Sequence, residues 1–159
     1  MTRFSEKVFS REALAFRVGE IRSSGGRVGF TNGCFDIIHP GHVRYLKKAR
    51  LECDALVVGV NSDRSVKALK GPSRPLNDEF SRCEVLAALE CVDLVTVFDE
   101  DTPRELITRI MPDMLFKGGD WKESEIAGAA EVKSNGGRVL IIPYEDGFST
   151  TNIISRMKG

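Results

Sequence analysis

Short apolar runs, separated by segments with helical spacing, constrain the fold of this chain more than any other feature. The runs cover residues 28–31, 56–60, 94–98, 114–116 and 139–142, and they are continuous rather than alternating. Continuous runs of this length are typical of strands covered on both faces. Helical spacing recurs between them, at 43–51, 79–89, 103–110 and 126–134. The alternation predicts an α/β fold with one doubly wound parallel sheet and helices on both faces.

Two segments flank or interrupt this pattern. Residues 10–24 have amphipathic spacing and end at a glycine pair, so we expect a leading helix within an N-terminal helical extension, residues 1–26. Residues 67–78 combine a glycine and two prolines with two lysines and an arginine, which predicts a mobile basic loop. A chain of 159 residues fits a single domain, 1–159.

Composition excludes several classes of partner. Lysine plus arginine (23) balances aspartate plus glutamate (23), so the chain lacks the positive field of a nucleic-acid binder. No N-terminal run resembles a signal peptide, and no stretch approaches the roughly 20 apolar residues that span a bilayer. The four cysteines have no paired spacing and are expected to be reduced. We expect a cytoplasmic protein that binds neither nucleic acid nor membrane.

The first strand leads into a glycine turn and then into a helix that begins with two histidines. Ligands of open α/β sheets bind at the carboxyl ends of strands, so chemistry is expected here. The helix start presents free N–H groups and the positive end of its dipole, which favours a phosphate. The residues concerned are Thr31, Asn32, Gly33, Cys34, Phe35 and Asp36, followed by His39, Pro40, Gly41 and His42.

The histidine pair is the strongest catalytic candidate. His39 and His42 stand three residues apart on one helical turn and can face the same phosphate. Imidazoles there can donate to the oxygens of a five-coordinate phosphorus, which stabilises charge that develops only in the transition state. Helix capping and metal binding are simpler interpretations, but a metal would need a third ligand, for which Asp36 is the only near candidate. Cys34 has no obvious activating base, so a role as nucleophile is disfavoured.

These motifs resemble the signature of the HxGH nucleotidyltransferase superfamily. TNGCFD at 31–36 and HPGH at 39–42 carry the resemblance. It implies a Rossmann-like fold and a direct in-line transfer, without a covalent enzyme intermediate, in which His39 and His42 stabilise the α-phosphate. Nucleotide contacts are expected from Thr31, Asn32, Gly33, Cys34, Phe35 and Gly41.

A second phosphate site is predicted near the C-terminus. Ser149 is a good N-cap, and the hydroxyl and N–H groups of Ser149, Thr150 and Thr151 can form an anion nest, although capping alone would explain them. The resemblance implies that this helix start holds the β- and γ-phosphates. Ile154 departs from the fuller family pattern, because many members carry an arginine there.

Other cations are therefore expected to hold the phosphates. Lys70 and Arg82 match the family's loop lysine and following-helix arginine best, and Lys70 is predicted to be catalytic; simple solvation competes for both. The paired glycines after the fourth run let the backbone approach a ligand, but a tight turn with a capping aspartate explains the spacing equally well. The resemblance implies nucleotide contact by Lys117, Gly119 and Asp120. We expect Asp36, Asn61 and Lys67 to contact the second substrate.

Residues 30–154 resemble one branch of the superfamily, the adenylyltransferase half of ADP-heptose synthases. The resemblance implies transfer of AMP from ATP to D-glycero-D-manno-heptose 1-phosphate for lipopolysaccharide core synthesis, by a stand-alone enzyme without the sugar-kinase half. Mg²⁺ is implied, held mainly by ATP phosphates and water and without a dedicated protein ligand set. A glycerol 3-phosphate cytidylyltransferase and a catalytically silent nucleotide-binding module remain alternatives. A homodimer is expected from its general prevalence.

Overall fold

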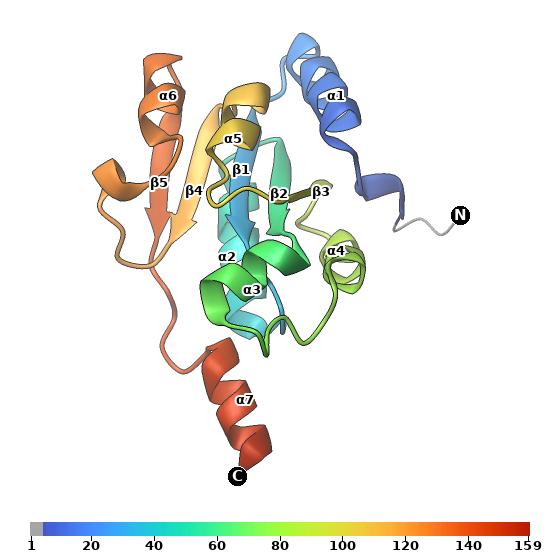
Figure 1. Cartoon of the computed structure of the whole chain (residues 1–159). Helices are drawn as coiled ribbons and strands as arrows, with labels where there is room; N and C mark the ends of the chain where they lie inside the picture. The colour runs from blue at the N-terminus through green and yellow to red at the C-terminus, as the bar shows by residue number, and fades with distance from the viewer. Residues whose placement is uncertain (1–4) are drawn as a thin grey trace.

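A five-stranded parallel sheet forms the centre of the computed structural model, which describes residues 5–159 (Figure 1). The strands are β1 (Val28–Gly33), β2 (Ala55–Asn61), β3 (Leu94–Phe98), β4 (Met114–Gly118) and β5 (Arg138–Ile142). Their order is β3-β2-β1-β4-β5, and every neighbouring pair is parallel. The predicted Rossmann-like α/β fold is confirmed. The order reverses between β1 and β4, so a ligand site is expected at the carboxyl ends of these strands.

Helices cover both faces of the sheet. The α-helices are α1 (Arg11–Ser23), α2 (Pro40–Leu51), α3 (Asp63–Lys70), α4 (Glu79–Ala87), α5 (Arg104–Ile110), α6 (Ala129–Ser134) and α7 (Thr150–Lys158), with short 3₁₀ turns η1 (Ser5–Lys7) and η2 (Glu123–Glu125). Apolar residues of α2 and α4 share one core cluster, whereas those of α1, α5 and α6 share the other. None of the helices described for residues 5–159 is long and apolar enough to cross a membrane.

Strand β2 shows why its apolar run is continuous. Val58 and Val60 belong to the cluster under α2 and α4, while Val57, which points to the opposite face, belongs to the cluster under α1, α5 and α6. All three side chains are fully buried. Both faces of the strand are therefore covered, as the sequence predicts.

The predicted basic loop at 67–78 is partly wrong. Residues 67–70 form the last turn of α3, a helix that begins at its N-cap Ser62, whose hydroxyl accepts the N–H of Ser65, and ends at Gly71 with φ 96°. Lys67 and Lys70 therefore lie on a helix, and only residues 71–78 form a loop. The predicted helix at 126–134 also starts later, at Ala129, because Gly128 adopts a left-handed conformation with φ 83°.

The first and last α-helices lie differently relative to the sheet. Helix α1 falls within the predicted N-terminal extension, of which residues 1–4 lie outside the described residues, and it covers a sheet face through Leu14 and Val18. Helix α7 extends away from the sheet on the side toward which the strand arrows point (Figure 1). The start of α7 consequently meets the carboxyl ends of the strands.

Candidate active site

A cavity of about 820 Å³ opens at the carboxyl ends of the strands. Segments that are far apart in the sequence line it, including the turn after β1, the start of α2, the end of α3 and the start of α7. The predicted residues that line it are Asn32, Gly33, Cys34, Phe35, Asp36, His39, Gly41, His42, Asn61, Lys70, Lys117, Ser149, Thr150 and Thr151. Most of the predicted site thus comes together in one space.

Five predicted residues lie outside the cavity wall, namely Thr31, Lys67, Arg82, Gly119 and Asp120. Thr31 is buried beneath it, with its hydroxyl 2.8 Å from the Tyr45 hydroxyl. Gly119 lies at a bend just after β4 with φ 94°, and it donates its N–H to the carbonyl of Ile142 at the end of β5. Lys67 and Asp120 are exposed and do not line the cavity. This geometry does not support direct contacts of Thr31, Lys67, Gly119 or Asp120 with a ligand in the cavity.

The two histidines lie against each other at the start of α2. Their ring centroids are 3.8 Å apart, and the backbone N–H of His39 donates to Nδ1 of His42 at 3.3 Å. Because Nδ1 of His42 accepts, the proton of its neutral ring lies on Nε2, which is left free to donate. His42 therefore closes the helix start and retains a donor, so the capping and catalytic interpretations are compatible.

Both imidazoles are held neutral. Burial, together with the nearby charges of His39 and Lys70, lowers the pKa of His42 to about 4. Burial also lowers the pKa of His39. At neutral pH the pair consequently offers hydrogen-bond donors without a fixed positive charge.

Gly41 allows the starts of α2 and α7 to approach each other. A Cβ at Gly41 would lie 2.9 Å from the His39 ring and 2.9 Å from Cβ of Phe148. Thr150 donates its hydroxyl to the carbonyl of Ile37 at 3.3 Å, and Arg44 lies 5.0 Å from the Phe148 ring centroid. Two helix N-termini therefore line the same cavity. Each offers free N–H groups and the positive end of a helix dipole, which favour a phosphate.

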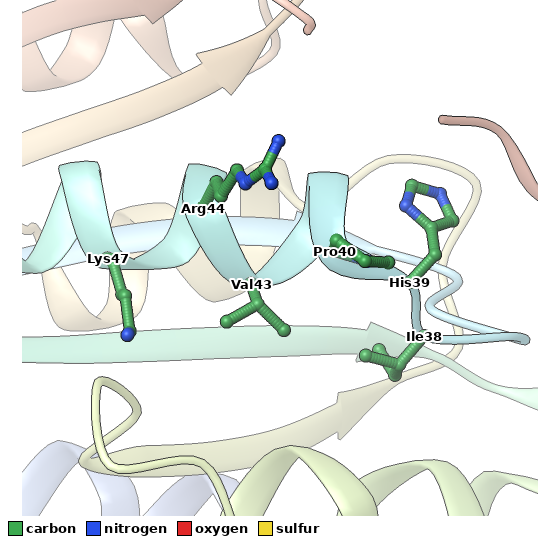
Figure 2. A pocket seen from close by; sticks show the side chains of 6 residues that line it. All are labelled: Ile38, His39, Pro40, Val43, Arg44 and Lys47. Carbon is green, nitrogen blue, oxygen red and sulfur yellow. The ribbon is translucent and has the colours of Figure 1, made fainter. Parts of the chain in front are cut away.

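The outer face of α2 carries a second groove of about 480 Å³, which shares only His39 with the main cavity. Figure 2 shows its six lining residues, with Val43 and Ile38 on one side of the helix and the His39 ring projecting to the other. Lys47 lies in this groove, two turns from the histidines, and does not line the main cavity. It supplies a matched control position on the same helix.

Asp36, which was predicted to contact substrate, lines the cavity but is hydrogen-bonded within the chain. Its buried carboxylate accepts from Arg74 Nε at 2.7 Å and from the backbone N–H groups of Leu76 and Asn77 at 2.9 Å. Burial alone would raise the pKa of Asp36, but these donors outweigh burial and lower the pKa below its usual value. Asp36 is thus occupied in fixing the 71–78 loop and is not a free third ligand for a metal.

Arg82 is also misassigned by sequence reasoning, because its side chain is fully buried and does not line the cavity. The guanidinium donates to the carbonyls of Cys34 and Asn61 at 2.7 Å each. It also donates to the Asn77 carbonyl at 3.0 Å and pairs with Asp63 at 2.9 Å. Arg82 therefore joins the ends of β1 and β2 to the loop rather than facing a phosphate.

The cavity has two chemically different walls. Beyond β4 and β5 it is lined by flat rings and a glycine, namely Trp121, Tyr144 and Gly118, with Lys117 placed 4.8 Å from the Trp121 ring centroid. Burial lowers the pKa of Lys117. Beyond β2 and β3 the wall is polar, with Asn61, Asp101 and Thr102. The first wall suits a flat base, and the second suits a hydroxylated acceptor.

Several residues of the cavity were missed by sequence reasoning. Arg74, Tyr45, Asp101, Thr102, Trp121 and Tyr144 line it without belonging to a predicted site. Trp121 alone had a usable signal, because it stands two residues after the paired glycines. Burial raises the pKa of the Cys34 thiol despite the nearby charges of Lys70, Arg82 and Arg74, which does not favour a thiolate nucleophile.

Residues 30–156 match the family described as cytidylyltransferase-like. The chain belongs to this family. The predicted membership of the HxGH nucleotidyltransferase superfamily is thereby confirmed.

The most similar curated relatives are much longer proteins. The bifunctional protein HldE of Rhodopseudomonas palustris strain BisA53 is 57% identical over 143 residues, which are 90% of this chain and 29% of the relative. The bifunctional protein HldE of Bradyrhizobium diazoefficiens is 55% identical over 152 residues, or 96% of this chain and 31% of the relative. The chain therefore spans about a third of the length of these relatives.

Two solved structures share the fold. A lipopolysaccharide core biosynthesis protein from Thermoplasma volcanium GSS1 has a TM-score of 0.63 and 30% identity, covering 76% of this chain and 98% of the other. Pantoate-beta-alanine ligase from Francisella tularensis has a TM-score of 0.56, with 95% of this chain and 76% of the other covered. At 16% identity, the ligase supports the fold alone.

Proposed function

We propose that this chain is an adenylyltransferase that moves AMP from ATP to D-glycero-D-manno-heptose 1-phosphate. The products are ADP-heptose, used in lipopolysaccharide core synthesis, and pyrophosphate. The observation that carries the proposal is 57% identity to a bifunctional protein HldE over 90% of this chain. The substrates are proposed from the resemblance of its motifs to those of the adenylyltransferase half of ADP-heptose synthases. The convergence of two helix N-termini on one cavity fits a triphosphate.

The proposed reaction is a single in-line displacement. A phosphate oxygen of the acceptor forms a bond to the α-phosphorus of ATP as the bond from that phosphorus to the pyrophosphate oxygen breaks. A phosphate monoester loses its second proton near pH 6, so the nucleophile is already anionic and needs no base from the protein. The two neutral imidazoles therefore need only donate hydrogen bonds and need not remove a proton from the acceptor.

The starts of α2 and α7, together with Lys70, stabilise the transition state in this proposal. The free Nε2–H of His42, the His39 ring and the N–H groups at the start of α2 donate to the oxygens of the α-phosphate. The N–H and hydroxyl groups of Ser149, Thr150 and Thr151 bind the departing pyrophosphate, and Lys70 adds positive charge. These interactions strengthen as negative charge moves onto the leaving group.

The residues of the site fit the proposed Mg²⁺ only as a partner of the nucleotide. Within residues 5–159, no group of three histidine, cysteine, aspartate or glutamate side chains is placed to hold a metal ion. The hydroxyl oxygens of Ser149 and Thr150 in the cavity wall are the ligand type that this hard cation accepts. When bound to ATP, Mg²⁺ supplies charge neutralisation, and the protein positions the nucleotide.

A glycerol 3-phosphate cytidylyltransferase is the second candidate, favoured by the Ser-Thr-Thr start of α7 and by the name of the family. The test is pyrophosphate release with Mg²⁺, crossing ATP and CTP against heptose 1-phosphate and glycerol 3-phosphate. Release only from ATP with heptose 1-phosphate supports the proposal, and release only from CTP with glycerol 3-phosphate overturns it in favour of the second candidate. No release from any pair would instead favour a silent nucleotide-binding module.

The proposal includes a cytoplasmic enzyme that acts as a homodimer. The cytoplasm supplies the ATP that the reaction consumes. The homodimer rests on general prevalence among small enzymes. Sedimentation of the purified chain at micromolar concentration tests it, because a monomer would contradict it.

A further inference from the structure

Arg74 lines the cavity, and only part of its guanidinium is hydrogen-bonded within the chain. Its side chain is 14% exposed, and its Nε donates to Asp36 at 2.7 Å. Its Nη2 is buried and has no acceptor in the part of the chain that the structure describes. A buried donor without an acceptor costs about 1–3 kcal/mol, which an anionic ligand would recover.

The surrounding network fixes the orientation of Arg74. Asp36 is buried and also accepts from the backbone of Leu76 and Asn77, so the residues that follow Arg74 are held on the same carboxylate. The buried Arg82 holds the Asn77 carbonyl at 3.0 Å and the Cys34 carbonyl at 2.7 Å. Hydrogen bonds therefore hold the loop that carries Arg74. Its side chain has little rotamer freedom, so ligand binding costs little side-chain entropy.

The chemistry of the position suits a phosphate. A guanidinium can engage a carboxylate with one edge and a phosphate with another, because its donors are fixed in a planar fork. The positive charges of Lys70 and Arg74 both bear on the Cys34 thiol, so these cations gather on one side of the cavity. Helix α7 presents no arginine at its start, where Ile153 and Ile154 follow the cap, and Arg82 is fully used inside the protein. Arg74 is thus the arginine placed to meet a bound anion.

We infer that Arg74 is a phosphate-binding residue of this site and that Asp36 is the positioning residue that orients it. This inference rests on the proposed function. The phosphate belongs either to the nucleotide or to the acceptor, which present the same chemistry to a guanidinium. The experiment below separates these two sources.

The variants are Arg74→Gln, Arg74→Lys and Asp36→Asn, with Arg64→Gln as a matched control. Arg64 is an exposed arginine that pairs with Asp99 and does not line the cavity. Calorimetry measures the binding of ATP with Mg²⁺ in the absence of acceptor, and steady-state assays give KM and kcat for the acceptor. Thermal unfolding of each variant shows whether it is folded.

Arg74→Gln should lower kcat/KM by about ten- to a hundredfold, the range for losing a hydrogen bond to a charged group. Arg74→Lys should recover part of this loss, since it keeps the charge but not the fork. Asp36→Asn should weaken the same substrate interaction as Arg74→Gln. Arg64→Gln should leave both the ATP affinity and the acceptor KM unchanged. A loss of ATP affinity assigns Arg74 to the nucleotide, whereas a rise confined to the acceptor KM assigns it to the acceptor.

An unchanged ATP affinity together with an unchanged acceptor KM in folded Arg74→Gln would overturn the inference. If that variant does not fold, the wild-type chain labelled with ¹⁵N-arginine provides a second measurement. The Nε–H signal of Arg74, identified with Arg74→Lys, should shift on addition of ATP with Mg²⁺ or of heptose 1-phosphate, and no shift with either overturns the inference. Failure of wild-type turnover alongside an ATP-induced shift would refute the proposed function and leave the role of Arg74 standing.

Discussion

Replacing Arg82 by leucine should destabilise the protein rather than weaken nucleotide binding directly. The side chain is fully buried and donates to three carbonyls, those of Cys34, Asn61 and Asn77. Leucine fills part of the space but leaves these acceptors without their donor. It also removes the partner of Asp63.

The size of the effect follows from these contacts. Each buried acceptor left unsatisfied costs about 1–3 kcal/mol, and three carbonyls lose their donor, whereas the pair with Asp63 adds little because that side chain is 35% exposed. Some carbonyls can turn toward water in the adjacent cavity, so we expect a loss of about 3–5 kcal/mol in the free energy of unfolding. For a domain of this size, each kcal/mol lowers Tm by about 2–4 °C, which predicts a fall of roughly 6–20 °C.

Urea denaturation, followed by circular dichroism, measures the loss. Arg64→Leu is the control, because that arginine is exposed on the neighbouring helix α3 and should leave the midpoint unchanged. A variant Arg82→Leu with wild-type stability and a selective loss of ATP affinity would refute the reasoning. That outcome would return Arg82 to the phosphate-binding role that sequence resemblance implied.

Four further predictions concern residues that line the cavity. His39→Ala or His42→Ala should lower turnover by about a hundredfold or more, as loss of a transition-state donor does, while Lys47→Ala on the outer face of α2 should not; wild-type pyrophosphate release by both histidine variants would contradict this. Because burial and the charges of His39 and Lys70 lower the pKa of His42 to about 4, this group should cause no step in kcat/KM between about pH 5 and 8. The unfolded chain binds that proton near 6.5, so the free energy of unfolding should fall as pH drops from 6.5 toward 4, and His42→Ala should show less of this fall. Cys34→Ser should retain turnover, and an inactive, folded variant would argue for a nucleophile.

Local patterns predicted the sheet and the histidine site well. The strands appear as continuous apolar runs because both faces of the sheet are covered, and β3 begins and ends where expected. His39, Gly41 and His42 could be placed because the turn, the helix start and the donors are contiguous in the chain. The start of α7 was predictable for the same reason, since Ser149 caps it by accepting the N–H of Asn152 at 3.0 Å.

Long-range partners explain what the sequence could not predict. Asp36 was expected to face substrate, but its partner Arg74 lies 38 residues away. Arg82 meets the Cys34 carbonyl across 48 residues, a backbone contact that no side-chain motif announces. Helix α3 was missed because it is only 8 residues long and is bounded by Ser62 and Gly71 rather than by a repeated apolar pattern.

The most direct test of the account is the formation of ADP-heptose by this chain alone. The purified protein is incubated with Mg²⁺, ATP and D-glycero-D-manno-heptose 1-phosphate, and the product is identified by mass spectrometry beside the double variant His39→Ala/His42→Ala. The account predicts ADP-heptose and an equal amount of pyrophosphate from the wild type, with almost none from the double variant. Equal product from both proteins would contradict the role of the histidines, and its absence from both would contradict the proposed reaction.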